Sequence, residues 1–295
     1  MLRPACLTLA LSLALISGAV RAETSSAGGP PQIHVDPAPA TRRPAIELGV
    51  GPASEQWEMF FDQISVRNVT GAALYPVRPR DGHANGRAII VVPGGGYCFV
   101  SIDSEGFRVA DALAAQGYTA FVLKYRTMQT PRQMAAYLAE TGKLFANLGK
   151  EELADNPPAV DDLAAAVRVV RERAAEWRVD PARIGVVGFS AGARTAIRLI
   201  EQKPEASLLE NVALIYPPML GSVTGGPRPP LFLVIAADDP LFRQGGLGML
   251  QRWLAESTKI EFHLYGSGSH GFGMRPQGTT SDLWISQYLA WLDRH

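Results

Sequence analysis

The sequence predicts an α/β protein whose mostly parallel central sheet is covered by helices on both faces. Short apolar runs alternate with stretches of helical spacing from about residue 87 to the end of the chain. Most positions in those runs are apolar, which is typical of strands buried on both faces. Of the 295 residues, 47% are hydrophobic and 19% are charged, so the chain has enough apolar side chains for a sizeable core. This composition excludes a disordered chain.

The apolar runs are the predicted strands of the sheet. They are Arg87–Val92, Thr119–Lys124, Ile184–Phe189, Val212–Tyr216, Leu231–Ala236 and Ile260–Leu264. Amphipathic stretches between and after them predict helices at Ser104–Ala115, Asp161–Trp177, Ala191–Ile200, Leu241–Ser257 and Ser281–Leu292. The earlier stretch Met59–Val77 predicts one or two further strands, antiparallel at one edge. In such a sheet the functional residues lie at the carboxyl ends of the strands.

The first residues have the pattern of a secretory signal peptide. Arg3 supplies a positive charge, and Leu7 to Val20 is an apolar run that is short for a membrane span. Small residues then lead to Ala22, after which we expect cleavage. A retained membrane anchor is the alternative interpretation.

Three segments are therefore expected: a signal peptide at 1–22, a Pro/Ala-rich arm at 23–50 and one α/β domain at 51–295. Cleavage predicts an exported protein, periplasmic or secreted, that does not stay in the membrane. It leaves Cys98 as the single cysteine, so no intramolecular disulfide is expected and the core alone must stabilise the fold.

Charge and histidine spacing exclude several function classes. The 28 basic residues balance the 28 acidic ones and no long basic run occurs, so nucleic acid is not an expected partner. The five histidines are scattered singly and no H-E-x-x-H pattern appears, which disfavours a zinc deacetylase. We expect neither a metal nor a cofactor.

The motif with chemical content is Gly188-Phe189-Ser190-Ala191-Gly192, where a predicted strand meets a predicted helix. A serine at that position sits in a tight, strained turn and presents its hydroxyl above the edge of the sheet. Ser190 is therefore the candidate nucleophile. The alternative is an ordinary strand-to-helix turn.

A serine nucleophile needs a general base, which in turn needs an acid to orient it. His270 lies in a Gly- and Ser-rich loop just after the last predicted strand, where the base is expected, whereas His263 lies within that strand and His295 ends the chain. Asp238 and Asp239 follow the preceding strand. One of them is expected to accept the imidazole N–H and the other to cap the next helix, and the pattern alone does not decide between them.

The glycine-rich loop Pro93–Tyr97 follows the first parallel strand. Its backbone N–H groups, together with that of Ala191, are candidates for an oxyanion hole. A simple loop hinge is the alternative. Tyr97, beside the glycines, is a candidate wall of the acyl or sugar pocket, with a core tyrosine as the alternative.

The segment Thr127–Pro158 interrupts the alternation of strands and helices. Its apolar residues predict either a small helical cap over the site or a surface excursion with a core of its own.

At these motifs the chain resembles the α/β-hydrolase superfamily. Within it, the chain looks like the acetylesterase and acetylxylan-esterase-like branch of exported bacterial carboxylesterases, whose members are sometimes named as xylanases. The resemblance runs from about Trp57 to Leu292. The residues that carry it are Pro93-Gly94-Gly95-Gly96-Tyr97, Lys124-Tyr125-Arg126, Val179 to Gly192, Asp239-Pro240 and Ser269-His270-Gly271-Phe272.

The resemblance implies a triad of Ser190, Asp239 and His270, because the acid of the family matches the second aspartate. It also implies three backbone oxyanion donors, namely those of Gly95, Gly96 and Ala191. One departure concerns Pro93, which stands where related esterases often carry a histidine that supports the loop.

The expected function is that of an exported, metal-independent serine carboxylesterase that hydrolyses short acyl esters. Acetyl groups on xylan or another polysaccharide are the expected target, so the partner is a small ester or an acetylated saccharide. A peptidase or lactone hydrolase on the same fold is one alternative. A catalytically idle carbohydrate-binding protein is an alternative from another class.

Overall fold

The computed structural model describes residues 35–51, 54–60, 63–220 and 223–295. The predicted signal peptide and the first part of the predicted arm lie outside these residues. Within them, no helix is both long and apolar enough to cross a membrane.

The main sheet has eight strands in the order β12-β11-β10-β9-β6-β8-β5-β2. The strands predicted from the apolar runs are all present and lie parallel to one another: β6 (Ala88–Val92), β8 (Thr119–Lys124), β9 (Ile184–Phe189), β10 (Asn211–Ile215), β11 (Leu231–Ala236) and β12 (Ile260–Tyr265). Two antiparallel strands, β5 (Ala73–Val77) and β2 (Ile46–Glu47), complete the edge beyond β8. The predicted fold class is confirmed.

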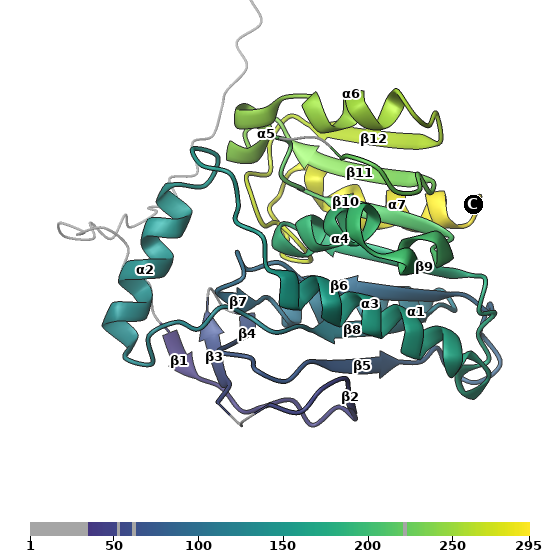
Figure 1. Ribbon diagram of the computed structural model, residues 1–295, viewed down its shortest axis with the longest axis horizontal. Coiled ribbons are helices and arrows are strands. Elements are labelled where there is room, and N and C mark those ends of the chain that lie inside the picture. Colours follow the sequence, from purple (N-terminus) through teal and green to yellow (C-terminus); the bar gives the residue numbers. More distant parts are fainter. Residues whose placement is uncertain (1–34, 52–53, 61–62, 221–222) are drawn as a thin grey trace, which may run out of the picture. The chain divides into compact units, whose positions relative to one another are not determined.

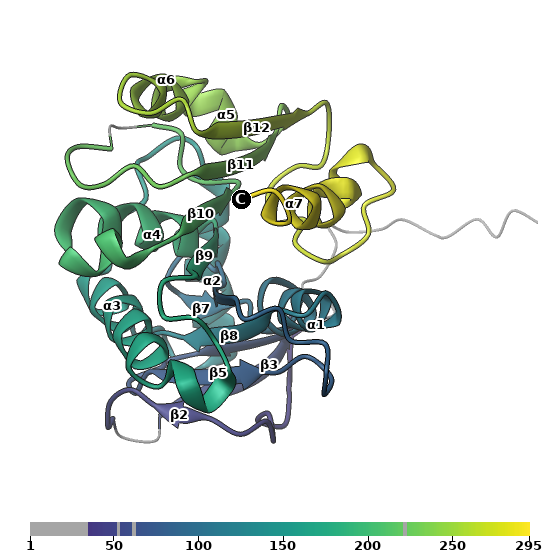
Figure 2. The same ribbon diagram turned by 90° about the vertical axis from the view of Figure 1, so that its right-hand side faces the viewer.

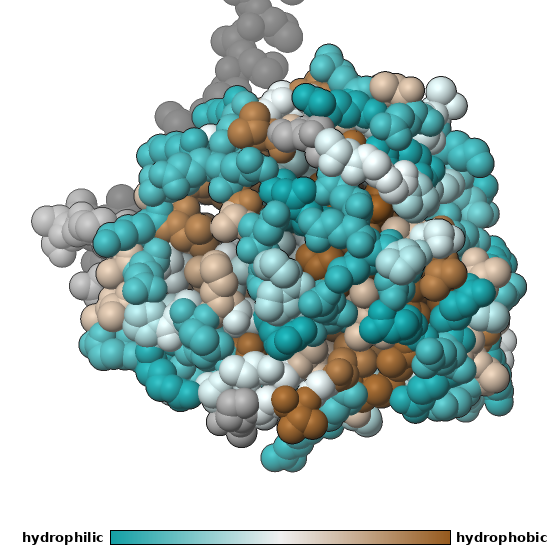
Figure 3. All heavy atoms as spheres, in the orientation of Figure 1, coloured by the Kyte–Doolittle hydropathy of each residue, from teal (hydrophilic) through white to brown (hydrophobic). Residues whose placement is uncertain are grey.

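Helices cover both faces of this sheet, as Figure 2 shows. On one face lie α3 (Pro157–Glu172) and α4 (Ala191–Gln202), and on the other lie α1 (Arg108–Ala115) and α7 (Trp284–Leu292). The side chains of β6, β8, β9, β10 and β11 are buried at every position, because both faces of these strands are covered. On the face seen in Figure 3 the surface is largely hydrophilic and hydrophobic residues form small separate patches.

Three stretches differ from the sequence prediction. The expected helix Leu241–Ser257 is two helices, α5 (Pro240–Gly245) and α6 (Gly248–Leu254), because the chain turns at Gly246 with a φ of +54°. The expected helix Asp161–Trp177 begins earlier, at Pro157, where proline suits the first turn, and it ends at Glu172, after which Ala174–Trp177 forms a 3-10 turn.

The third difference is a second sheet with the order β1-β3-β4-β7. Its strands are β1 (Val35–Pro37), β3 (Gln56–Phe60), β4 (Gln63–Arg67) and β7 (Phe99–Val100). The stretch Met59–Val77 therefore feeds two sheets, and β5 alone joins the main one. The predicted arm also contributes two short strands, β1 and β2.

The predicted insertion Thr127–Pro158 contains α2 (Met134–Ala146), which stands beyond the end of the sheet toward which β11 points (Figure 1). Two buried arginines attach this insertion, which we call the cap, at its two ends. At its start, Arg67 donates to the carbonyl oxygen of Pro131 at 2.6 Å and lies 4.2 Å from the ring centre of Tyr137. At its end, Arg194 of α4 pairs with two carboxylates, those of Glu152 at 2.8 Å and Asp155 at 2.9 Å.

Arg67 is 1% exposed, and its guanidinium makes two hydrogen bonds of 2.9 Å to the buried carboxylate of Glu58. We expect Arg67→Met to lower the free energy of unfolding by about 3 kcal/mol, because it leaves a buried carboxylate unpaired. Urea denaturation measures this change. Lys203→Met removes the exposed pair with Asp161 and should cost about 1 kcal/mol or less. Equal losses in the two variants would contradict the structural role of Arg67.

Candidate active site

Ser190 occupies the sharp turn that the sequence predicts between β9 and α4. Its backbone has a φ of +48° and a ψ of −112°, a strained combination for a residue with a side chain. The residue occupies the N-cap position of α4, makes no capping hydrogen bond with its side chain and is 8% exposed. The turn thus presents one hydroxyl to the cavity from a rigid strand and helix.

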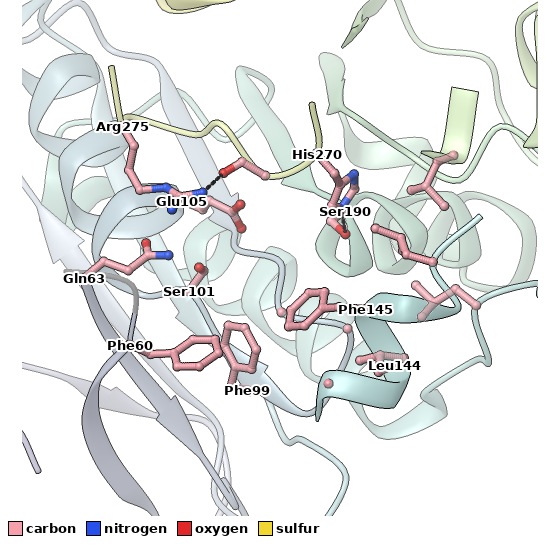
Figure 4. Close-up of a pocket in the computed structure, with 17 residues that line it drawn as sticks. Phe60, Gln63, Phe99, Ser101, Glu105, Leu144, Phe145, Ser190, His270 and Arg275 are labelled. Atoms are coloured by element: carbon pink, nitrogen blue, oxygen red, sulfur yellow. Dashed lines mark hydrogen bonds between the residues drawn. The ribbon is translucent and has the colours of Figure 1, made fainter. Parts of the chain in front are cut away.

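The imidazole of His270 lies against this hydroxyl, as Figure 4 shows. The Oγ of Ser190 is 2.8 Å from the Nε2 of His270. The ring of Tyr216, at the end of β10, packs edge-on against the imidazole with 5.0 Å between ring centres. The base predicted from the loop after the last strand is therefore within reach of the predicted nucleophile.

Asp239 orients the imidazole. Its Oδ2 is 2.8 Å from the Nδ1 of His270, and its Oδ1 accepts the backbone N–H of Leu241 at 2.8 Å. The carboxylate is fully buried. One aspartate therefore performs both roles that the sequence analysis divided between two, since it contacts the imidazole and also caps α5.

Asp238 points to the backbone of the histidine loop instead. It accepts the N–H groups of Ser269 at 2.8 Å and Gly268 at 3.4 Å. The expectation that the aspartate without contact to the imidazole caps the next helix is wrong, because Asp239 itself caps α5. Asp238 fixes the path of the chain just before His270.

The glycine loop lies opposite the turn at Ser190. Gly95 has a φ of +125°, and a Cβ there would lie 2.1 Å from the carbonyl oxygen of Phe99, so no other residue fits. Among the described residues, the backbone N–H groups of Gly95, Gly96 and Ala191 make no hydrogen bond to the protein. Free N–H groups on both sides of the serine are what an oxyanion hole requires.

Two side chains support this loop in the absence of a histidine at position 93. The hydroxyl of Tyr125 donates to the carbonyl oxygen of Pro93 at 2.9 Å. The carboxylate of Glu105 accepts the N–H of Gly94 at 2.7 Å. Hydrogen bonds to the carbonyl oxygen of Pro93 and to the N–H of Gly94 therefore fix the position of the loop.

Glu105 also connects the glycine loop to the histidine. Its other oxygen accepts the hydroxyl of Tyr216 at 2.7 Å, and that hydroxyl accepts the N–H of Gly273 at 3.1 Å. Burial raises the pKa of Glu105, and it raises the pKa of Tyr216 well above its usual range, so the phenol keeps its proton and donates. Glu105 lies in a π-helical turn, Asp103–Phe107, a distortion that is frequent at functional sites.

Two residues weighed in the sequence analysis lie away from the chemistry. Tyr97 is fully buried, its hydroxyl is 3.0 Å from that of Thr195, and it does not line the cavity, so its position is that of a core tyrosine. Burial raises the pKa of the Cys98 thiol to about 11, which keeps it protonated.

Beside Ser190 lies a cavity of about 450 Å³ with an apolar wall and a polar wall (Figure 4). Much of the apolar wall comes from the cap, which the sequence analysis left open as a lid or a surface excursion. The cap contributes Leu144, Phe145, Leu148 and Leu153 to this wall, and β7 contributes Phe99. The polar wall consists of Gln63, Ser101, Glu105 and Arg275.

Sequence reasoning missed the whole polar wall. Glu105 had a detectable signal, because it lies four residues before the buried Val109 on the inward stripe of a predicted helix. Gln63 and Ser101 had none, because they belong to the second sheet and to a loop after it. Within the described residues, no three His, Cys, Asp or Glu side chains are grouped so as to hold a metal ion.

A parallel sheet covered on both faces, with a serine at the strained turn after β9 and a histidine in the loop after β12, defines an α/β-hydrolase. The chain belongs to the dienelactone hydrolase family, whose model matches residues 75–291. It is therefore a hydrolytic enzyme, as the sequence predicts, and its resemblance to the acetylxylan-esterase-like hydrolases is confirmed.

Two curated proteins illustrate the relationship. The chain is 26% identical to an acetylxylan esterase of Xylanibacter ruminicola over 242 residues, which cover 70% of this chain and 45% of that protein. It is 32% identical to endo-1,4-beta-xylanase B of Butyrivibrio fibrisolvens over 104 residues, which cover 35% of this chain and 13% of that protein. The chain thus spans less than half the length of the curated relatives it matches.

Solved structures share the fold. An acetyl ester-xyloside bifunctional hydrolase from Caldicellulosiruptor lactoaceticus superposes with a TM-score of 0.58 at 22% identity, covering 77% of this chain and 89% of that one. An esterase from Pyrobaculum calidifontis superposes with a TM-score of 0.58 at 20% identity, covering 76% and 79%. At this level of identity the likeness concerns the fold alone.

The turn at Ser190 depends on a close approach of Gly192 to β6. A Cβ at that position would lie 2.0 Å from the carbonyl oxygen of Val92. We expect Gly192→Ala to destabilise the fold by about 3 kcal/mol, because the backbone of the turn must move away from the strand. Thermal unfolding measures the change. Gly49→Ala, at an exposed position with open space around it, serves as the matched control. Equal unfolding temperatures for the two variants would contradict this account.

Proposed function

We propose that the protein is a serine carboxylesterase that hydrolyses short acyl esters, with Ser190, His270 and Asp239 as its catalytic triad. The observation that carries the proposal is the continuous hydrogen-bonded chain from the Ser190 hydroxyl through His270 to the buried Asp239, with distances of 2.8 Å at both steps. A serine hydroxyl becomes a nucleophile only when a base can remove its proton, and this chain supplies the base and its orienting acid.

In the first half of the reaction, the Oγ of Ser190 attacks the ester carbonyl carbon and transfers its proton to the Nε2 of His270. The carboxylate of Asp239 holds the imidazole in the required tautomer and stabilises the positive charge that develops. The N–H groups of Gly95, Gly96 and Ala191 stabilise the oxyanion. Collapse of the tetrahedral intermediate breaks the bond to the alcohol, which leaves with the proton from His270, and an acyl-serine ester remains.

In the second half, His270 removes a proton from water, and the resulting hydroxide attacks the acyl-serine carbonyl through the same oxyanion site. Collapse releases the carboxylic acid and returns the proton to Ser190. Asp238 contributes by fixing the backbone just before His270, and Glu105 by tying the glycine loop to Tyr216. These two carboxylates are positioning residues.

Acetyl is the proposed acyl group, and acetylated xylan or a related saccharide is the proposed target. The similarity to an acetylxylan esterase, and the fold shared with an acetyl ester-xyloside hydrolase, support this choice. A lactone hydrolase is a second candidate, which the family itself favours. It differs in products, because opening a lactone yields a single hydroxy acid, whereas hydrolysing an acyclic ester yields two molecules. Measuring kcat/KM on δ-valerolactone and on a simple acetate ester distinguishes the lactone hydrolase from the esterase.

Ser190→Ala and Asp239→Asn should each reduce kcat on p-nitrophenyl acetate by at least about a thousandfold, because the members of a triad act as a unit. Asp238→Asn is the matched control. Its amide oxygen can still accept the N–H of Ser269, so we expect a loss of less than about tenfold, on the order of one neutral hydrogen bond. Circular dichroism checks that each variant is folded. Wild-type turnover in Ser190→Ala would refute the nucleophile.

We expect kcat/KM to fall at least about tenfold from the p-nitrophenyl ester of acetate to that of octanoate. A chain of eight carbons must share the cavity beside Ser190 with the leaving group, and its extra length cannot be accommodated without loss of contacts. Initial rates on a series of acyl lengths measure the preference, with Ser190→Ala recording the background. A rise toward octanoate would show that the apolar wall binds long acyl chains.

Export is part of the proposal, and it is supported by the apolar run and small residues at the start of the chain. Expression of the full chain in a Gram-negative host should yield periplasmic protein whose first residue is Glu23. N-terminal sequencing tests this expectation. Ala22→Gln should block that cleavage. A cytoplasmic product that still begins at Met1 would exclude the signal peptide.

A further inference from the structure

Apart from Glu105, which positions the glycine loop, the residues of the polar wall have no part in the proposed reaction. Gln63 and Ser101 belong to this wall, and they are only 6% and 4% exposed. Polar side chains this deeply buried normally have hydrogen-bond partners. The hydrogen bonds of these two side chains therefore indicate whether the wall only stabilises the fold or can also bind a ligand.

Gln63 is held by one end of its amide. Its Oε1 accepts the hydroxyl of Ser104, which leaves the NH₂ group at the cavity. Among the described residues, neither that NH₂ group nor the hydroxyl of Ser101 makes a hydrogen bond. In Figure 4 both side chains lie on the same side of the cavity as Glu105 and Arg275. A fixed donor and a hydroxyl that can donate or accept thus face one space.

Arg275 lies beside Gln63 and Ser101 in the polar wall. Its Nη2 donates to the carbonyl oxygen of Gly271, but its Nε is buried and has no partner among the described residues. Leaving a buried N–H without a partner costs about 1–3 kcal/mol. That buried Nε is not open to the cavity, so what Arg275 offers a ligand there is the outer part of its guanidinium.

The wall is suited to neutral hydroxyl groups rather than to an anion. The carboxyl of Glu105 and the guanidinium of Arg275 lie in the same wall, so their charges offset each other and the wall has no net positive charge to attract an anion. A hydroxyl can accept from the amide of Gln63 and donate to Ser101 or Glu105, so each polar atom finds a complement. Several hydroxyls at fixed spacing are what a sugar ring presents.

The loop that carries His270 also connects the reacting centre to the polar wall. His270 gives its proton to that alcohol, so the alcohol oxygen lies close to Nε2. Gly271 and Arg275, which line the cavity, follow His270 in the same loop. An ester whose alcohol half lies on the side of Gln63 and Ser101 leaves the apolar wall to its acyl half.

We propose that Gln63, Ser101 and Arg275 form a subsite for the hydroxyl groups of a sugar alcohol, and that this subsite gives the enzyme its preference for acetylated saccharides. The inference rests on the proposed esterase function and deepens it by naming residues that select the alcohol. A site built to hydrogen-bond a hydroxyl discriminates strongly against an analogue that lacks it, because its polar groups are then left unpaired.

The test compares two acetate esters of a six-membered oxygen ring, one with free hydroxyl groups on the ring and one without them. One is a monoacetate of methyl β-xyloside, and the other is 4-acetoxytetrahydropyran, which has the same ring without free hydroxyls. We expect Gln63→Leu and Ser101→Ala each to lower kcat/KM for the xyloside acetate about tenfold, the loss of one hydrogen bond. Activity on 4-acetoxytetrahydropyran should change by less than about twofold. The exposed Gln202→Leu is the matched control and should change neither rate.

The outcomes separate this inference from the function on which it rests. Wild-type protein that hydrolyses neither acetate, nor p-nitrophenyl acetate, would remove the esterase function and the subsite together. The subsite alone would be overturned if the wild-type protein hydrolyses both acetates and the variants either lower both rates equally or lower neither rate. Because Gln63→Leu also releases Ser104, a loss confined to the xyloside acetate in Ser101→Ala is the outcome that supports the subsite independently.

Discussion

The left-handed backbone of Ser190 is the constraint on which the rest of the site depends. With a φ of +48° directly after a buried strand, the chain reverses so abruptly that the hydroxyl and the first N–H of α4 face the same space. The turn persists because β9 and α4 are both packed into the core and cannot relax around it. The triad, the oxyanion donors and the cavity are all arranged around this fixed point.

A second set of contacts holds the separate segments of the site in fixed positions relative to one another. Glu105 holds the glycine loop through Gly94 and holds Tyr216 through its phenol, and Tyr216 in turn packs against His270. The nucleophile, the base and the oxyanion loop come from three separate segments, so their geometry depends on such links. A buried carboxyl that accepts two short hydrogen bonds is a rigid connection between them.

Residues whose roles follow from local pattern could be predicted from the sequence. The strands of the main sheet, the turn at Ser190 and the loop position of His270 each have a signal in consecutive residues. The second sheet could not be predicted, because its pairing of β4 with β7 joins residues far apart in the sequence. The two roles of Asp239 and the burial of Tyr97 were also hidden, since both depend on which direction a side chain takes within the packed fold.

The attachment of the cap by Arg67 and Arg194 has a consequence for how such enzymes diversify. The two guanidinium groups lie on β4 and α4, outside the cap, whereas the residues between their contacts, which include α2, form much of the apolar side of the cavity. That intervening segment is therefore a replaceable module: a designer can exchange it for another of different length or shape while both anchoring arginines and the reacting groups stay in place.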